Sequence, residues 1–287
     1  MFDHLNYDSP NDIKDLLQSF GFNPRKKWGQ NFLINPQARI RIVEALQLER
    51  DMSVWEVGPG LGAITHHLLD VSSHLTVFEI DPGYIALLQK WFGDIEGFSI
   101  VEGDVIKTWK SVRAEKGEAA RVVGNLPYNA ASSIISSFID AQYYPEVLVI
   151  TVQKEMAERM IAKPGNKNYS SFSILCQSTF DVKLTGDLKP GSFFPRPEVV
   201  SSIAQMKPHG HIEDIINKDQ FFKLVRELFS SKRKTLKNNI LGSPLANSLG
   251  RERVLDAFSD MGIDIKLRPE TISVEQYIGV SNKLQNK

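Results

Sequence analysis

The chain has 287 residues, of which 42% are hydrophobic and 24% charged, a composition typical of a globular protein with a sizeable core. Its 34 Lys and Arg residues balance 34 Asp and Glu residues, so any phosphate contacts must come from local clusters rather than a uniformly basic surface. The single cysteine, Cys176, excludes an intrachain disulfide and a thiolate metal cluster and indicates a reducing, cytoplasmic location. We expect neither a secretory signal nor a membrane-spanning segment, because no basic stretch precedes an apolar run and no long apolar segment occurs.

Two helices are predicted before the first strand. A Ser-Pro pair begins residues 9–21, where apolar side chains recur at helical spacing until a glycine ends the pattern. An Asn-Pro pair gives the same start signal for residues 35–48. The first 20 residues form a leader to which the sequence assigns no role.

Short apolar strands then alternate with helical stretches. The predicted strands are residues 54–57, 75–80, 98–101, 121–124 and 147–152. Two later strands, 175–184 and 199–206, are expected to form an antiparallel hairpin at the edge of the sheet. Alternation of strands and helices indicates an α/β fold with a doubly wound, mostly parallel sheet.

After Pro208 the pattern becomes helical. Apolar side chains recur at helical spacing in residues 221–229, 254–261 and 274–278. We therefore expect two domains, a larger one at residues 1–207 and a small helical one at residues 208–287.

The strand at 54–57 runs into a turn with three glycines, Gly58, Gly60 and Gly62. Glycines let the backbone approach a ligand closely, and in a doubly wound sheet this turn lies at the edge where ligands bind. The spacing differs from the G-x-G-x-x-G of dinucleotide enzymes, and Pro59 lacks the backbone N–H that a pyrophosphate would need. The turn thus favours a ligand without phosphates and argues against a nicotinamide oxidoreductase.

Carboxylates follow the next two strands. Glu79 lies near the end of the second strand, where it can accept hydrogen bonds from ribose hydroxyls. Asp104 follows the third strand and can accept from an adenine amino group, although an Asp after a Gly is most often only a turn residue. With the glycine turn, these residues predict a nucleoside site.

The fourth strand ends in Asn125-Leu126-Pro127-Tyr128. The lone pair of adenine N6 is delocalised into the ring, but two acceptors around the amine, the Asn125 side-chain oxygen and the Leu126 carbonyl, can turn it toward tetrahedral geometry. Pro127 would help hold that carbonyl, and Tyr128 can stack on an unstacked base. Catalysis would then depend on orientation and electrostatics rather than on a strong base. Without the nucleoside site, the same four residues would indicate only a turn.

Together these motifs resemble the small-subunit (16S) rRNA adenine N6,N6-dimethyltransferase family of the kasugamycin-sensitivity type, over almost the whole chain. The segments that carry the resemblance are residues 27–33, 56–62, 125–128, 153–155, 193–197 and 231–236. The resemblance implies a Rossmann-like class I methyltransferase sheet with a small C-terminal α-helical domain. It implies S-adenosyl-L-methionine as methyl donor and S-adenosyl-L-homocysteine as product. Two departures are Glu198-Val199-Val200, where the family usually has Lys-Val-Asp, and the long leader.

The resemblance also implies site residues and a substrate. The residues expected to contact the cofactor are Asn31, Leu33, Gly58, Gly60, Glu79, Asp104 and Asn125. Phe193 matches the aromatic residue that faces Tyr128 across the target base. The implied substrate is a pair of adjacent adenosines in the 3′-terminal hairpin loop of 16S rRNA, each dimethylated on the pre-30S subunit late in assembly. We expect a monomer without a metal ion.

Two basic clusters are candidates for RNA contact. One contains Arg25, Lys26 and Lys27, and the other contains Lys232, Arg233, Lys234 and Lys237. Such clusters are as often solvated faces as RNA contacts, but placed on both domains they could flank an RNA hairpin. They predict an RNA-binding role for the helical domain as well.

Two alternatives stay open at this point. One is the related large-subunit (23S) dimethyltransferase of the macrolide-resistance type, which the Pro-rich loop and the tail of this chain disfavour. The other is a non-catalytic RNA-binding assembly factor on the same fold, against which the intact Asn-Leu-Pro-Tyr sequence argues. His66-His67 are neighbours that point to different faces of a helix, so no metal pair is predicted.

Overall fold

The computed structural model describes residues 5–21, 31–127 and 130–285. The chain divides into two compact units. Unit 1 comprises Met1–Ser137, Tyr143–Ala157 and Lys183–Lys207, and unit 2 comprises Phe138–Gln142, Glu158–Val182 and Pro208–Lys287. Unit 2 thus contains the chain from Pro208 onward together with two earlier segments.

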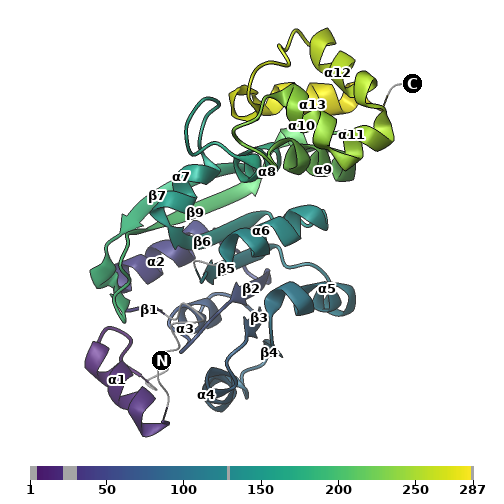
Figure 1. Ribbon diagram of the computed structural model, residues 1–287. Coiled ribbons are helices and arrows are strands. Elements are labelled where there is room, and N and C mark those ends of the chain that lie inside the picture. The colour runs from purple at the N-terminus through teal and green to yellow at the C-terminus, as the bar shows by residue number, and fades with distance from the viewer. Residues whose placement is uncertain (1–4, 22–30, 128–129, 286–287) are drawn as a thin grey trace. The chain divides into compact units, whose positions relative to one another are not determined.

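A seven-stranded sheet, belonging largely to unit 1, has the strand order β4-β3-β2-β5-β6-β9-β7 (Figure 1). The strands are β2 (Ser53–Val57), β3 (His74–Glu79), β4 (Phe98–Glu102), β5 (Arg121–Asn125), β6 (Val147–Gln153), β7 (Phe180–Leu188) and β9 (Ser201–Pro208). Strands β2 to β6 pair in parallel, and β9 is antiparallel to β6. The predicted doubly wound, mostly parallel sheet is confirmed. The order reverses at β2, and ligands bind at such switch points.

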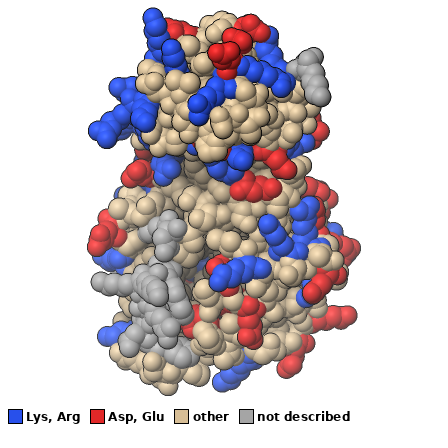
Figure 2. Space-filling model, turned by 45° about the vertical axis from the view of Figure 1, so that its right-hand side comes forward, with Lys and Arg blue, Asp and Glu red and all other residues tan. Residues whose placement is uncertain are grey.

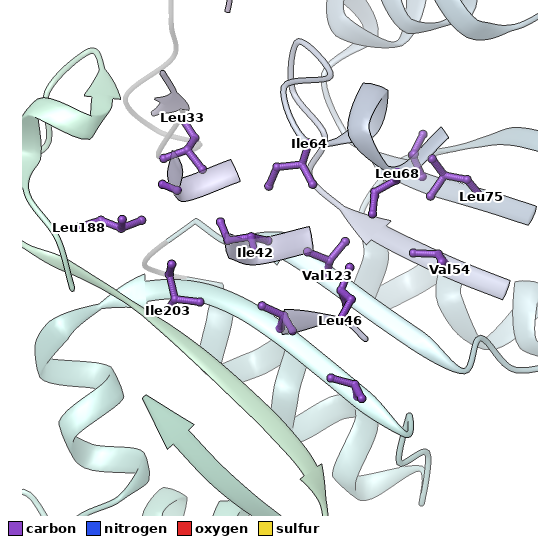
Figure 3. Close-up of a cluster of buried hydrophobic side chains, with 14 of the residues drawn as sticks. Leu33, Ile42, Leu46, Val54, Ile64, Leu68, Leu75, Val123, Leu188 and Ile203 are labelled. Carbon is purple, nitrogen blue, oxygen red and sulfur yellow. The ribbon is translucent and has the colours of Figure 1, made fainter. Parts of the chain in front are cut away.

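Helices cover both faces of the sheet because successive strand residues point to opposite sides. On one side Val54 joins a core with α2 and α3, and Figure 3 shows Ile42 and Leu46 in the same cluster. On the other side the Trp55 ring centroid lies 5.3 Å from that of Tyr143. The helices around the sheet are α2 (Pro36–Ala45), α3 (Thr65–Leu69), α4 (Pro82–Phe92), α5 (Val105–Lys116), α6 (Ala131–Asp140) and α7 (Lys154–Met160).

The leader forms the predicted helix α1 (Pro10–Ser19), capped by the Ser9 side chain. The second predicted helix is α2, whose cap is the side chain of Asn35. Between them the short strand β1 (Phe32–Leu33) pairs antiparallel with β8 (Phe193–Phe194). This two-stranded ladder was not predicted, because strands of two residues leave no periodic pattern in the sequence.

The expected strand over 175–184 is wrong in its first half. Residues Ser171–Thr179 form helix α8, and β7 begins only at Phe180. The side chains of Ser170 and Ser173 form a capping box that starts the helix. Almost every residue of α8 is buried, so its apolar run has no polar face and cannot be distinguished from a buried strand by periodicity. The strands β9 and β7 do lie together at the sheet edge.

Unit 2 is helical around an aromatic core. Its remaining helices are α9 (Lys218–Leu228), α10 (Leu236–Gly242), α11 (Pro244–Leu249), α12 (Arg251–Asp260) and α13 (Val274–Lys283). Three were predicted, whereas α10 and α11 are too short for a clear periodic signal. Phe229 and Tyr277 pack against each other, and the Tyr277 hydroxyl donates to the Pro269 carbonyl. No helix within the described ranges is long and apolar enough to cross a membrane.

Candidate active site

A cavity of about 250 Å³ opens at the carboxyl ends of β2, β3, β4 and β5 in unit 1. All seven residues expected to contact a cofactor line it: Asn31, Leu33, Gly58, Gly60, Glu79, Asp104 and Asn125. They come from five separate segments of the chain. For the four segments at strand ends, convergence was expected because parallel strands present their carboxyl ends at one edge. For Asn31 and Leu33 it was expected from the family resemblance alone.

The described lining of the cavity carries acidic groups and no basic ones. Three carboxyl groups, those of Glu56, Glu79 and Asp104, line it, and its described lining contains no Lys or Arg. Apolar side chains such as Phe32 and Ile64 form much of the remaining wall. A carboxylate in apolar surroundings attracts cations and repels phosphate, so the cavity suits a positively charged ligand.

Glu79 ties the second strand to the glycine turn. One carboxylate oxygen accepts the backbone N–H of Gly60 at 3.0 Å, and the other accepts those of Ile80 and Asp81. These bonds fix the carboxylate at the strand end and lower its pKa, but burial outweighs them and raises the pKa above its ordinary value. The side chain therefore both shapes the turn and presents a fixed acceptor in the cavity.

Glu56 is a cavity residue that the sequence analysis missed. Its side chain is 1% exposed, and Oε2 accepts a hydrogen bond from the Thr65 hydroxyl at 2.6 Å. Burial raises its pKa to about 8, and the nearby Glu79 carboxylate contributes to the same shift. A carboxyl residue in the middle of an otherwise buried strand was the available signal.

The glycine turn has the geometry that only glycine adopts without strain. Gly58, Gly60 and Gly62 have φ of 69°, 58° and 83°, in the left-handed region. A Cβ on Gly60 would lie 3.4 Å from the Phe32 ring, and one on Gly62 would lie 2.8 Å from the Phe92 ring. All three positions favour glycine for their backbone conformation, and Gly62 also leaves no room for a Cβ.

Asp104 caps helix α5 at the far end of the cavity. Its Oδ1 accepts the backbone N–H of Ile106 at 3.0 Å, which holds the carboxylate at the start of the helix. Gly103, Val105 and Ile106 line the cavity beside it. A planar base placed there would have apolar contacts on its faces and a carboxylate at its edge.

At the end of β5, Asn125 joins two walls of the cavity. Its Nδ2 donates to the carbonyl of Asn31 at 2.8 Å, which turns Oδ1 away from Asn31. Leu126 is buried and does not line the cavity, but its N–H donates to the carbonyl of Thr151 at 3.2 Å, which holds the backbone there. Pro127 lines the cavity, and its carbonyl accepts from the two alanines at the start of α6, at 2.9 and 3.1 Å.

Phe193 packs in a hydrophobic cluster of unit 1. Its side chain is 1% exposed in the hydrophobic cluster that includes Leu33, and it does not line the described cavity. The structure thus gives it a packing contact, because β8 pairs with β1 and presents this ring inward. Stacking on a base stays a prediction for Phe193. Tyr128, and the basic residues Arg25, Lys26 and Lys27, lie outside the described residues.

The second basic cluster lies in unit 2, in the segment between α9 and α10 and in the first turn of α10. We call Lys232, Arg233, Lys234 and Lys237 the basic turn, and all four are exposed. The buried Asn239 holds this segment, because its Nδ2 donates to the carbonyls of Ser231, Lys234 and Thr235 at 3.2–3.3 Å. Figure 2 shows acidic and basic side chains interspersed over the visible face, as the zero net charge implies.

The sheet order, the glycine turn and the strand-end carboxylates define a nucleoside-binding domain of the methyltransferase type. The chain belongs to the ribosomal RNA adenine dimethylase family, which matches residues 21–286. A relative from Treponema denticola, "Ribosomal RNA small subunit methyltransferase A", is 41% identical over 96% of this chain and 95% of its own length. A protein of the same name from Borreliella burgdorferi is 41% identical, over 98% and 96%. The resemblance inferred from the motifs is confirmed.

Solved structures agree with this assignment. A dimethyladenosine transferase from Plasmodium falciparum has a TM-score of 0.73 and 25% identity, covering 86% of this chain and 94% of its own. The 23S rRNA methyltransferase ErmE has a TM-score of 0.63 and 22% identity, covering 89% and 100%. At 22% identity, the similarity to ErmE shows only that the two chains share a fold. The predicted Rossmann-like methyltransferase fold with a C-terminal helical region is confirmed.

Proposed function

We propose that the chain transfers two methyl groups from S-adenosyl-L-methionine to N6 of each of two adjacent adenosines in the 3′-terminal hairpin loop of 16S rRNA. We further propose that it acts as a monomer on the pre-30S subunit. The assignment of the small-subunit substrate follows the name shared by the relatives at 37–41% identity. The 23S alternative has support only from a shared fold.

The observation that carries the proposal is the composition of the described cavity lining, which has acidic side chains but no Lys or Arg. S-adenosyl-L-methionine supplies a methyl group on a positively charged sulfur, together with an ammonium group and an adenosine. The carboxyls of Glu56, Glu79 and Asp104 line the cavity without a basic side chain among its described lining. Glu79 would hold the ribose and Asp104 the adenine amino group, and Glu56 would face the cationic part.

Asn125 and its neighbours would handle the adenosine that accepts the methyl group. The Oδ1 of Asn125 and the Leu126 carbonyl would accept hydrogen bonds from the N6 amine and orient its lone pair toward the methyl group. The methyl carbon forms a bond to N6 as its bond to sulfur breaks, and N6 then loses one proton to solvent. Pro127, Tyr128 and Phe193 would hold the extruded base.

We propose that residues 1–207 form the catalytic domain and that residues 208–287 contribute RNA and particle binding. The basic turn supports this division, because four exposed cations on a held segment can contact phosphates without reading bases. For the N-terminal cluster of Arg25, Lys26 and Lys27 the proposal follows from sequence alone.

The test is mass spectrometry of 16S rRNA after incubation of precursor subunits with isotopically labelled S-adenosyl-L-methionine. The expected result is two labelled methyls on N6 of each of two adjacent adenosines. Asn125→Ala should lower the rate at least about 100-fold while largely preserving cofactor affinity, since it removes an acceptor needed in the transition state. Tyr128→Ala should act in the same direction.

The matched control is Asn247→Ala, which changes an exposed asparagine of α11 in the same way and should leave the rate unchanged. Labelling of 23S rRNA in place of 16S would overturn the substrate assignment. Cofactor binding without any transfer by the wild-type protein would favour the non-catalytic assembly factor. Full activity of Asn125→Ala would refute the role of that side chain.

A further inference from the structure

The leader packs against two walls of the cavity without lining it. Ile13 and Leu17 of α1 share an apolar cluster with Phe32 of β1 and Leu61 of the glycine turn. Figure 1 shows α1 near β1. No leader residue is among the described residues that line the cavity. The leader therefore packs against segments that form the cavity, while none of its described residues lines the cavity itself.

Tyr7 contacts the glycine turn at residues that are not among the described lining of the cavity. Its hydroxyl donates to the carbonyl of Leu61 at 2.9 Å. Its ring stacks on His66 with centroids 4.8 Å apart, and the His66 Nδ1 lies 3.2 Å from the carbonyl oxygen of Gly62. A Cβ on Gly62 would lie 3.3 Å from the Tyr7 hydroxyl. Tyr7 is thus in close contact with the last two residues of the turn.

Asp8 reaches the opposite wall through a buried arginine. The guanidinium of Arg39 pairs through Nη2 with the carboxylate of Asp8 and donates through Nη1 to the carbonyl of Leu33 at 3.1 Å. Leu33 lines the cavity. The same guanidinium lies 5.9 Å from the centre of the Tyr7 ring. Two consecutive leader residues therefore connect the glycine turn with the segment that carries Leu33.

We propose that the leader is a clamp for the cofactor site, in which Tyr7, Asp8 and Arg39 act as positioning residues. They fix the distance between the glycine turn and the segment around Leu33. The clamp rests on the proposed function, which assigns S-adenosyl-L-methionine to the cavity. Docking of the leader and binding of the cofactor are then linked equilibria. The cofactor must therefore stabilise the docked leader by the same factor by which the docked leader strengthens cofactor binding.

The first test measures cofactor affinity in the full-length protein. Tyr7→Phe keeps the ring and removes only the hydroxyl that donates to Leu61, and Asp8→Asn removes the charge that pairs with Arg39. Loss of the buried hydrogen bond in Tyr7→Phe should weaken binding of S-adenosyl-L-homocysteine roughly 3- to 10-fold, as measured by calorimetry. Asp8→Asn should act in the same direction. The matched control is Asp15→Asn, an equal charge change at an exposed position of α1, which should bind like the wild type.

Enzyme kinetics and hydrogen exchange separate a clamp from a merely structural role. The KM for the cofactor should rise by the same factor in Tyr7→Phe, with kcat at saturating cofactor and the KM for RNA unchanged. In the wild type, S-adenosyl-L-homocysteine should slow exchange of the amides of α1, although α1 does not line the cavity. This protection should be weaker in Tyr7→Phe.

The outcomes distinguish the clamp from the proposed function. If the wild type binds the cofactor and both leader variants bind equally well, the clamp is wrong and the proposed function stands. If the variants are only less stable, and exchange in α1 does not respond to the cofactor, the clamp is also wrong. A wild-type protein that binds neither S-adenosyl-L-methionine nor S-adenosyl-L-homocysteine would overturn the proposed function and the clamp with it.

Discussion

The cavity of unit 1 and the basic turn of unit 2 are built in opposite ways. In the cavity, Glu79 is buried and held by three backbone N–H groups, and Glu56 is held by Thr65. In the basic turn the cations are exposed, and the buried Asn239 holds only the backbone beneath them. One region presents fixed acceptors in an apolar space, and the other presents exposed charges in water.

This difference between the cavity and the basic turn indicates which region provides specificity for a small molecule and which provides affinity for a polyanion. A fixed, desolvated carboxylate distinguishes one small molecule from another, because a mismatched partner leaves it unpaired. Exposed cations attract any polyanion, and each adds a modest amount that salt screens. Substitutions in the cavity should therefore have large, salt-independent effects, and substitutions in the basic turn should have small, salt-dependent ones.

The largest effect is expected for Glu79→Ala. Loss of the ribose acceptor, together with the bond that holds Gly60, should weaken cofactor binding about 100-fold, corresponding to one or two charge-assisted hydrogen bonds. Calorimetry measures the change. The matched control is Glu102→Ala, which removes an exposed carboxylate from the residue in register with Glu79 on the neighbouring strand. Equal losses in both variants would contradict the assignment.

A pH dependence of stability is expected from Glu56. Its folded-state pKa of about 8 lies above its ordinary 4.5, so the folded protein binds the proton more tightly than the unfolded chain. The free energy of unfolding should therefore fall as pH rises from about 5 to 8, by at most about 1.4 kcal/mol per pH unit. Urea unfolding of the ligand-free protein across that range measures it.

The matched variant for this titration is Glu56→Gln, which stays neutral at every pH. The free energy of unfolding of Glu56→Gln should therefore fall less than that of the wild type between pH 5 and 8. An unchanged decline in Glu56→Gln would show that another group is responsible.

A smaller effect is expected for Asn239→Ala. Three backbone carbonyls would lose a shared donor, so the basic turn should become more mobile and RNA affinity should fall by roughly 5-fold. Filter binding of a 16S rRNA fragment measures it, with cofactor affinity as the internal control. An Asn239→Ala protein with wild-type RNA affinity would show that the shape of the turn is unimportant.

The smallest effect is expected for Lys234→Ala. Loss of one phosphate contact should weaken RNA binding about 2- to 4-fold and reduce the slope of log affinity against log salt by about 0.7–0.9. Lys283→Ala, an exposed lysine of α13, serves as the control. A large, salt-independent loss in Lys234→Ala would break the contrast between the two regions.

The sequence predicted the parts of the site that depend on chain topology. Gly58, Glu79, Asp104 and Asn125 each lie at or just after a strand end, and parallel strands bring such positions to one edge whatever the packing around them. The mostly parallel pairing of these strands followed from their alternation with helices.

The rest depends on packing that a motif does not encode. Phe193 matched a family position, but the β1–β8 ladder that buries its ring involves two residues from each strand and leaves no pattern. Residues 175–179 were predicted as strand because a fully buried helix lacks amphipathic periodicity. The contact of Tyr7 with Leu61 joins residues 54 positions apart, which no local pattern signals.

The central claim is that the cavity of unit 1 is an acidic site for a cationic, phosphate-free nucleoside. Calorimetric titration of the wild-type protein with S-adenosyl-L-methionine, and separately with ATP, tests it most directly, because the two share the adenosine and differ in charge. The account predicts saturable, one-site binding of S-adenosyl-L-methionine that Glu79→Ala weakens, and no binding of ATP at the same concentrations. Binding of ATP as tight as that of S-adenosyl-L-methionine would contradict it.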